Sequence, residues 1–78
     1  MIKAYVLMVT APGKTGGIVE QLTAMSAVQE VHEVMGPYDI VAEITAESLG
    51  DIAPLLSGQI RSISDVLSTT TLVAFGED

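Results

Sequence analysis

The feature that most restricts the fold is a tight turn at Gly36 and Pro37, which lies between two segments of strand-like composition. Gly36 can adopt a positive φ without steric cost, and Pro37 fixes its own φ at about −65°. The chain is therefore expected to reverse direction here, so that residues 28–35 and 38–45 form an antiparallel hairpin. Asp39 follows the turn and is predicted to lie at the mouth of this hairpin.

Two further strands are predicted, one at each end of the chain. Residues 2–9 form a β-branched and aromatic run of strand length that is closed by a Pro-Gly turn. Residues 66–75 form the other, and four consecutive hydroxyl-bearing residues lie inside it: Ser68, Thr69, Thr70 and Thr71. The hairpin thus has one strand before it and one after it.

Helices are predicted in the two segments that connect these strands. Apolar side chains recur at helical spacing in residues 14–25, and again in a second helix that begins at residues 47–49. Pro54 interrupts the second helix, and because proline lacks an N–H we expect a kink or a late start there. One face of this helix is predicted to be apolar, and it comprises Leu49, Ile52, Ala53, Leu56 and Ile60.

The order of the elements is strand, helix, strand, strand, helix, strand, within only 78 residues. This order predicts the α+β class and a ferredoxin-like βαββαβ sandwich, with an antiparallel sheet that carries both helices on one face. A chain of this length accommodates one domain, residues 1–78.

The first strand is apolar on both of its faces. Ala4, Val6 and Met8 point to one side, while Tyr5 and Leu7 point to the other. An antiparallel sheet with one face in water should alternate between apolar and polar side chains, and this strand does not. We therefore expect the second face to pack against the sheet of another subunit, so that the protein is an oligomer that dimerises through its sheet.

Charge and composition exclude several classes of function. The net charge is −7, and the three cations Lys3, Lys14 and Arg61 are too few and too scattered to neutralise a phosphate backbone, so direct binding of nucleic acid is not expected. No cysteine is available for a disulfide or a thiolate. No apolar run approaches the roughly 20 residues of a membrane span, and no signal peptide is evident, so we expect a cytoplasmic protein without a membrane partner.

The sequence resembles the C-terminal effector domain of the Lrp/AsnC (feast/famine) regulators, known as the RAM domain. The resemblance rests on residues 4–7 followed by Pro12-Gly13-Lys14, on residues 28–31 followed by Gly36-Pro37-Tyr38-Asp39, and on Arg61, Ile63 and Val66 before the threonines. It covers nearly the whole chain. It implies a ferredoxin-like domain that dimerises through its sheet, forms higher oligomers, and binds small effectors, typically amino acids, between dimers.

Full-length members of that family also carry an N-terminal helix-turn-helix that binds DNA, whereas this chain starts at its first strand. We therefore expect a stand-alone effector domain. A homodimer or a higher oligomer is the expected assembly, and co-assembly with full-length Lrp/AsnC regulators is a further hypothesis.

The resemblance places the ligand-binding residues on the turn and on the last strand, at Gly36, Tyr38, Asp39, Ser68, Thr69, Thr70 and Thr71. The carboxylate of Asp39 can pair with an ammonium, while hydroxyls and backbone N–H groups can hold a carboxylate. The alternative is that Asp39 only stabilises the turn through a local hydrogen bond. Alternate residues of a strand point to opposite faces, so at most half of the hydroxyls can line one pocket.

Other chemistry is weakly represented. His32 shares a strand face with Glu30, but a metal site needs another ligand, so no metal or cofactor is expected. No catalytic residues are predicted, because no Ser-His-acid arrangement is present and the absence of asparagine excludes an acylphosphatase. Two alternatives stay open, which are a ligand-free module that joins a DNA-binding relative and a small cofactor-free enzyme. Met8, Met25 and Met35 fall on apolar stripes and are predicted to fill the core.

Overall fold

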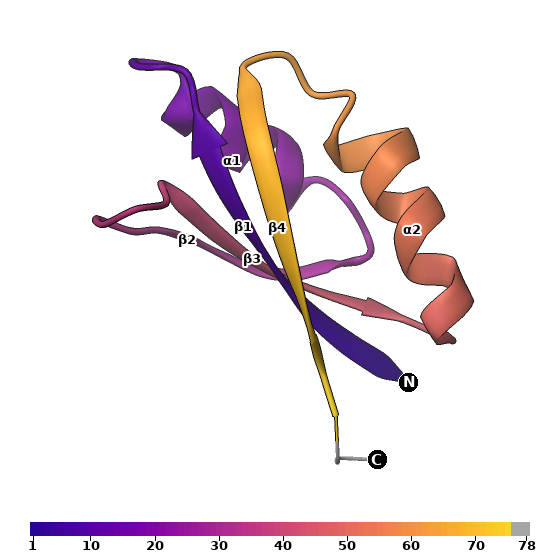
Figure 1. Cartoon of the computed structure of the whole chain (residues 1–78). Coiled ribbons are helices and arrows are strands. Elements are labelled where there is room, and N and C mark those ends of the chain that lie inside the picture. The colour runs from indigo at the N-terminus through magenta and orange to yellow at the C-terminus, as the bar shows by residue number, and fades with distance from the viewer. Residues whose placement is uncertain (76–78) are drawn as a thin grey trace.

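The computed structural model describes residues 1–75, and it contains a four-stranded antiparallel sheet with helices packed against it (Figure 1). The strands are β1 (Ile2–Thr10), β2 (Val28–Glu33), β3 (Ile40–Ala46) and β4 (Val66–Ala74). Helix α1 spans Thr15–Thr23. Helix α2 (Ile52–Leu55) is preceded by a 3-10 turn, η1 (Leu49–Asp51), and is extended by a π-helical turn, η2 (Leu56–Ile60).

The order of strands across the sheet is β2-β3-β1-β4, so β2 and β4 form its two edges. β1 pairs with β3 and with β4, and β2 pairs with β3, in each case antiparallel. This topology confirms the predicted ferredoxin-like α+β fold. No helix among residues 1–75 is long and apolar enough to cross a membrane.

The core lies between the sheet and the helices, which cover the same face. Ala4, Val6 and Met8 of β1 have no exposed surface, and they pack with Ile18 and Leu22 of α1. Ile52, Leu55 and Ile60 complete this core from the second helical segment. Burial of these apolar side chains is the main source of the stability of so short a chain.

Among residues 1–75, no helix covers the opposite face of the sheet, which we call the open face. Tyr5, Leu7 and Val9 of β1 lie there and are half-buried, as the alternation of the sequence predicts. Leu72 of β4 pairs with Tyr5 and is 52% exposed. The open face therefore presents apolar side chains of neighbouring strands to the surroundings of the chain.

The second helical segment departs from the predicted pattern in its apolar face. Leu49 is 57% exposed and Ala53 is also exposed, whereas Leu55 is buried. Leu49 belongs to the 3-10 turn that precedes α2, whereas Leu55 lies three residues after Ile52, on the same face of α2. In the π-helical turn that follows, the N–H of Arg61 donates to the carbonyl of Leu56 at 2.7 Å, and the next buried residue is Ile60, five positions after Leu55. The late start near Pro54 is confirmed, because this proline lies in the first turn of α2, where an N–H has no helical partner.

The hairpin strands are shorter at the turn than predicted. β2 ends at Glu33 and β3 begins at Ile40, so the loop spans residues 34–39 and is closed by the Val34 N–H, which donates to the Asp39 carbonyl at 2.9 Å. Gly36 adopts a φ of 153°, which agrees with its predicted role in reversing the chain. The prediction that Met35 fills the core is wrong, because this loop holds its side chain fully exposed, at 101% of the reference area.

Candidate functional site

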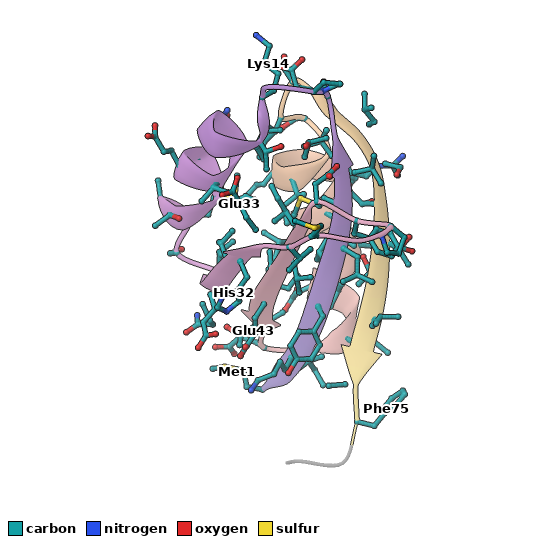
Figure 2. All side chains as sticks on the ribbon, turned by 90° about the vertical axis from the view of Figure 1, so that its left-hand side faces the viewer. Met1, Lys14, His32, Glu33, Glu43 and Phe75 are labelled. Atoms are coloured by element: carbon teal, nitrogen blue, oxygen red, sulfur yellow. The ribbon has the colours of Figure 1, made fainter. Side chains whose placement is uncertain are left out.

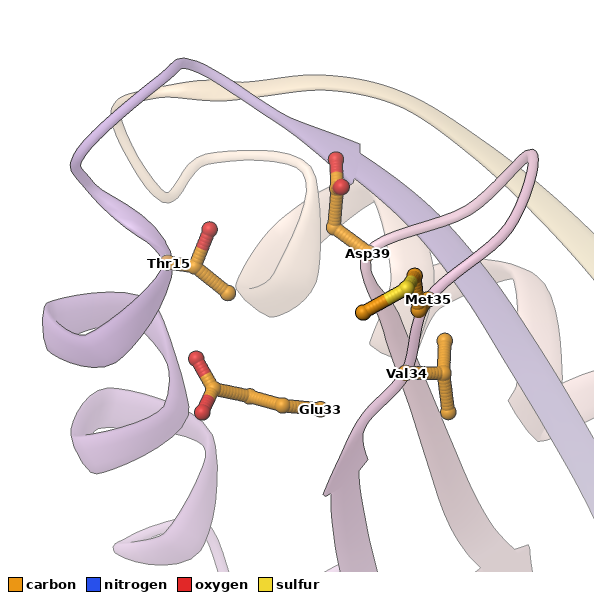
Figure 3. A pocket seen from close by; sticks show the side chains of 5 residues that line it. All are labelled: Thr15, Glu33, Val34, Met35 and Asp39. Atoms are coloured by element: carbon orange, nitrogen blue, oxygen red, sulfur yellow. The ribbon is translucent and has the colours of Figure 1, made fainter.

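An open cleft of about 390 Å³ lies between the start of α1 and the loop of residues 34–39 (Figure 3). Its lining residues are Thr15, Glu33, Val34, Met35 and Asp39. A volume of this size falls in the range of small-molecule sites in proteins. The cleft combines two carboxylates and a hydroxyl with two apolar side chains.

Asp39 is held in place by hydrogen bonds to the end of β1. Its backbone N–H donates to the carbonyl of Met8 at 2.8 Å, and its Oδ2 accepts the backbone N–H of Thr10 at 2.9 Å. These contacts span about 30 residues of sequence, so the interpretation of Asp39 as a local turn stabiliser is too narrow. Among the hydrogen bonds of residues 1–75, Oδ1 of Asp39 accepts none, so this oxygen can still take a donor from a ligand.

The hydroxyl groups of two threonines extend this network to the start of α1. Thr10 is only 6% exposed, and its Oγ1 lies 2.7 Å from Oγ1 of Thr15 and 3.4 Å from Oδ2 of Asp39. β1 thus contacts the Asp39 carboxylate directly through Thr10, and α1 is linked to it through the hydroxyl of Thr10. The network fixes the position of the Asp39 carboxylate before any ligand arrives.

Glu33 is the second carboxylate of the cleft and projects from the end of β2 toward α1 (Figure 3). It pairs in register with Ile40, whose side chain is buried on the helix-covered side of the sheet. Figure 2 shows Glu33 beside α1 and away from His32 and Glu43. Within residues 1–75 neither Glu33 nor Asp39 forms an ion pair, so the cleft has an uncompensated negative charge.

On the open face, residues 1–75 form one ion pair and one hydrogen bond between a histidine and a carboxylate. Nζ of Lys3 is 3.1 Å from Oε2 of Glu43, and this hydrogen bond and charge raise the pKa of Lys3 above its ordinary value. His32 and Glu30 share this face, as predicted, with Nε2 of His32 3.0 Å from Oε1 of Glu30. Across residues 1–75, no group of three His, Cys, Asp or Glu side chains is placed to hold a metal ion.

Of the seven predicted ligand-binding residues, only Asp39 lines the cleft. Gly36 and Tyr38 lie in the same loop, on either side of Pro37. The four hydroxyl-bearing residues are on β4, at the opposite edge of the sheet from β2. Their register divides them in the predicted way, with Ser68 and Thr70 on the open face and Thr69 and Thr71 on the helix-covered face.

The sequence patterns did not indicate the other four lining residues, which are Thr15, Glu33, Val34 and Met35. Thr15 is the first residue of α1 and Glu33 the last of β2, and their proximity depends on how α1 packs beside β2. The sequence does contain one signal for Glu33 as a lining residue, because it lies three residues before Gly36, on the strand that leads into the turn. A second cleft, of about 330 Å³, is lined by residues of β3, α2 and neighbouring segments and contains none of the predicted residues.

The comparisons with known proteins agree on one family. The profile of the Lrp/AsnC ligand binding domain matches residues 3–77. An uncharacterised HTH-type transcriptional regulator of Pyrococcus furiosus is 31% identical over 58 residues, which cover 74% of this chain and 39% of the regulator. The chain therefore spans about two-fifths of the length of the curated relatives that it matches.

Solved structures show the same fold. The crystal structure of FFRP-DM1 is 35% identical to this chain, with a TM-score of 0.93, and the match covers 96% of this chain and 100% of that one. A transcriptional regulator of Neisseria meningitidis, solved in complex with L-Met, is 9% identical with a TM-score of 0.88, over 97% of this chain and 51% of that one. At so low an identity, the latter similarity concerns the fold alone.

Proposed function

Because this chain belongs to the Lrp/AsnC ligand-binding domain family, we propose that it senses a small effector, an amino acid, and couples its binding to assembly. The relatives found by sequence are of the transcriptional regulator type, which supports a regulatory role rather than an enzymatic one. The negative charge of −7 disfavours direct contact with DNA, so the output of sensing is a change in protein–protein association. The cytoplasm is the compartment that suits this role.

The position of the Asp39 carboxylate is the observation that carries this proposal. Oδ2 is anchored by the N–H of Thr10, while Oδ1 remains available at the edge of the cleft. A fixed carboxylate next to a cleft suits an α-ammonium group, because a charge-assisted hydrogen bond needs little reorganisation there. The regulator of Neisseria meningitidis, which shares this fold, was solved with L-Met, so a protein of this fold can hold an amino acid.

Self-association completes the proposed site. Apolar side chains on the open face, including Leu7 and Leu72, favour a homodimer that packs sheet against sheet. The cleft lies on the helix-covered side of the sheet, so a further contact between dimers is needed to close it. In such an oligomer Gly36 and Tyr38 shape the loop beside Asp39.

The hydroxyls of β4 enter the proposal as contacts from a neighbouring subunit. Within one chain, Ser68, Thr69, Thr70 and Thr71 lie on the edge of the sheet opposite β2 and outside the lining of the cleft. Each face of β4 carries two of these residues, so one pair at most serves any single effector.

A second candidate function is that of an interaction module without a ligand, which joins the oligomer of a full-length Lrp/AsnC regulator. The apolar open face favours this candidate as well, because this surface can pack against the sheet of a relative as readily as against the sheet of a second copy of this chain. A pull-down with a full-length relative, run with and without amino acids, separates the two functions. Ligand-independent capture supports the interaction module.

Light scattering after size exclusion, repeated with each of the twenty amino acids at millimolar concentration, tests the primary proposal. We expect a defined oligomer whose size or thermal midpoint shifts with one or a few amino acids. A monomer that is indifferent to all of them refutes both self-association and sensing. An oligomer that is indifferent to all of them refutes sensing alone.

The ammonium contact is tested by Asp39→Asn, which retains an acceptor for the N–H of Thr10 but removes the negative charge. The matched control is Asp51→Asn, because Asp51 also accepts a hydrogen bond, from Oγ of Ser48 at 3.1 Å, and lies outside the cleft. Effector affinity is expected to fall in Asp39→Asn and to stay unchanged in Asp51→Asn. Equal affinity of the two variants contradicts a role for Asp39 in binding.

A further inference from the structure

We infer that Glu33 makes the cleft selective for amino acids with a second positive charge on the side chain, such as lysine. This inference rests on the proposed function, since it takes the α-ammonium of the effector to bind Asp39. Glu33 contributes a second carboxylate from a different element, the end of β2, whereas Asp39 belongs to the loop before β3. A ligand that spans the cleft therefore meets two separate negative groups.

The two carboxylates point in different directions, so one cationic group is not expected to satisfy both. Figure 3 shows the carboxylate of Glu33 directed toward α1, and that of Asp39 directed toward the end of β1. Asp39 is tied to Thr10, but Glu33 accepts no hydrogen bond among residues 1–75. Glu33 is thus free to turn toward the distal end of a bound ligand.

No basic side chain of the described chain neutralises the cleft. Lys3 is paired with Glu43 at 3.1 Å on the open face, and Lys14 points away from the body of the fold at the top of Figure 2. Arg61, the remaining cation, is exposed and forms no ion pair within residues 1–75. The electrostatic field in the cleft therefore favours a cationic ligand and repels a ligand with an acidic side chain.

The apolar part of the lining suits the aliphatic portion of such a ligand. Met35 is fully exposed and Val34 is 41% exposed, and both line the cleft on its loop side, with Met35 next to Asp39 (Figure 3). A flexible methionine can adapt to methylene groups, while the charged end of the ligand stays in contact with water and Glu33. Lysine, with four methylenes between its backbone and its ammonium, combines both properties.

The test compares L-lysine with L-norleucine, which has an aliphatic side chain but no side-chain ammonium, in calorimetric or NMR titrations of the full chain. Wild type is expected to bind lysine about fivefold more tightly than norleucine, as a partly exposed ion pair contributes up to roughly 1 kcal/mol. Glu33→Gln should abolish this preference. Glu20→Gln, which makes the same charge change at an exposed position of α1, should preserve it.

The outcomes separate this inference from the proposed function. If neither ligand binds the wild type, the proposed amino acid site is refuted, and the inference is refuted with it. If norleucine binds as tightly as lysine, or if Glu33→Gln retains the preference for lysine, the amino acid site stands and the role of Glu33 is overturned. A preference that is lost only in Glu33→Gln, and that weakens in 1 M salt, supports the inference.

Discussion

Replacing Asp39 by alanine should destabilise the fold even in the absence of an effector. Oδ2 of Asp39 accepts the backbone N–H of Thr10 at 2.9 Å, and Thr10 is only 6% exposed. Alanine removes this acceptor and leaves a buried N–H without a partner, which costs about 1–3 kcal/mol of unfolding free energy. In a domain of this size, each kcal/mol corresponds to a fall of about 4–8 °C in the melting temperature.

Asp39→Asn should destabilise the protein by less than Asp39→Ala, since the amide oxygen of asparagine can accept the same N–H. What it loses is the extra strength of a charged acceptor. Asp51→Ala is the control, because it removes an exposed hydrogen bond from Ser48 and is expected to change stability by no more than about 0.5 kcal/mol.

Urea denaturation of the four proteins at one fixed protein concentration measures these differences, because self-association would make stability depend on concentration. Two results would contradict this role of the Asp39 carboxylate. The first is an Asp39→Ala variant within about 0.5 kcal/mol of wild type, which would mean that water satisfies the N–H of Thr10. The second is equal destabilisation by alanine and asparagine, which would mean that the acceptor geometry is not what stabilises the loop.

Three other predictions concern the core, the ion pair and the open face. Leu22→Ala removes a side chain with no exposed surface and should cost about 2–5 kcal/mol in the same denaturation assay. Glu43 raises the pKa of Lys3 above its ordinary value of 10.5. The contribution of this pair to the free energy of unfolding is therefore complete below pH 10.5, and it is lost as the pH rises through the raised pKa. Thermal melts of wild type and Lys3→Met should therefore differ most at neutral pH and converge in strong alkali. Leu72→Glu places a charge on the open face and should reduce the mass of the oligomer found by light scattering, while the circular dichroism spectrum stays unchanged. An unaltered mass would contradict pairing of subunits through this face.

Much of the fold follows from patterns that are local in the sequence. The alternation of residues in β1 assigns Val6 to the core and Leu7 to the open face, because successive side chains of a strand point in opposite directions. Gly36 and Pro37 set the reversal of the chain between β2 and β3. Each of these features depends on neighbours within a few residues, so no tertiary information is needed to predict it.

The register of the second helical segment could not be obtained in this way. A regular period predicts Leu49 on the buried face, but Leu49 lies in a 3-10 turn before α2 and is exposed. The π-helical turn then lengthens the period, so that the buried Leu55 and Ile60 are five residues apart. Met35 was misassigned for a similar reason, because a loop interrupts the alternation of β2 two residues earlier than expected. A periodic pattern cannot indicate where its own period changes.

Local sequence patterns are enough to predict the order of the elements, the two faces of the sheet and the placement of Asp39 beside the turn. The surroundings of this carboxylate depend on tertiary packing. Thr10 and Asp39 are separated by 29 positions in the sequence, and Thr15 and Glu33 reach the same cleft from a helix and a strand that are brought together by tertiary packing. The physical reason is that periodicity fixes the direction of a side chain, whereas its neighbours are fixed by strand register and helix packing, which depend on the whole chain.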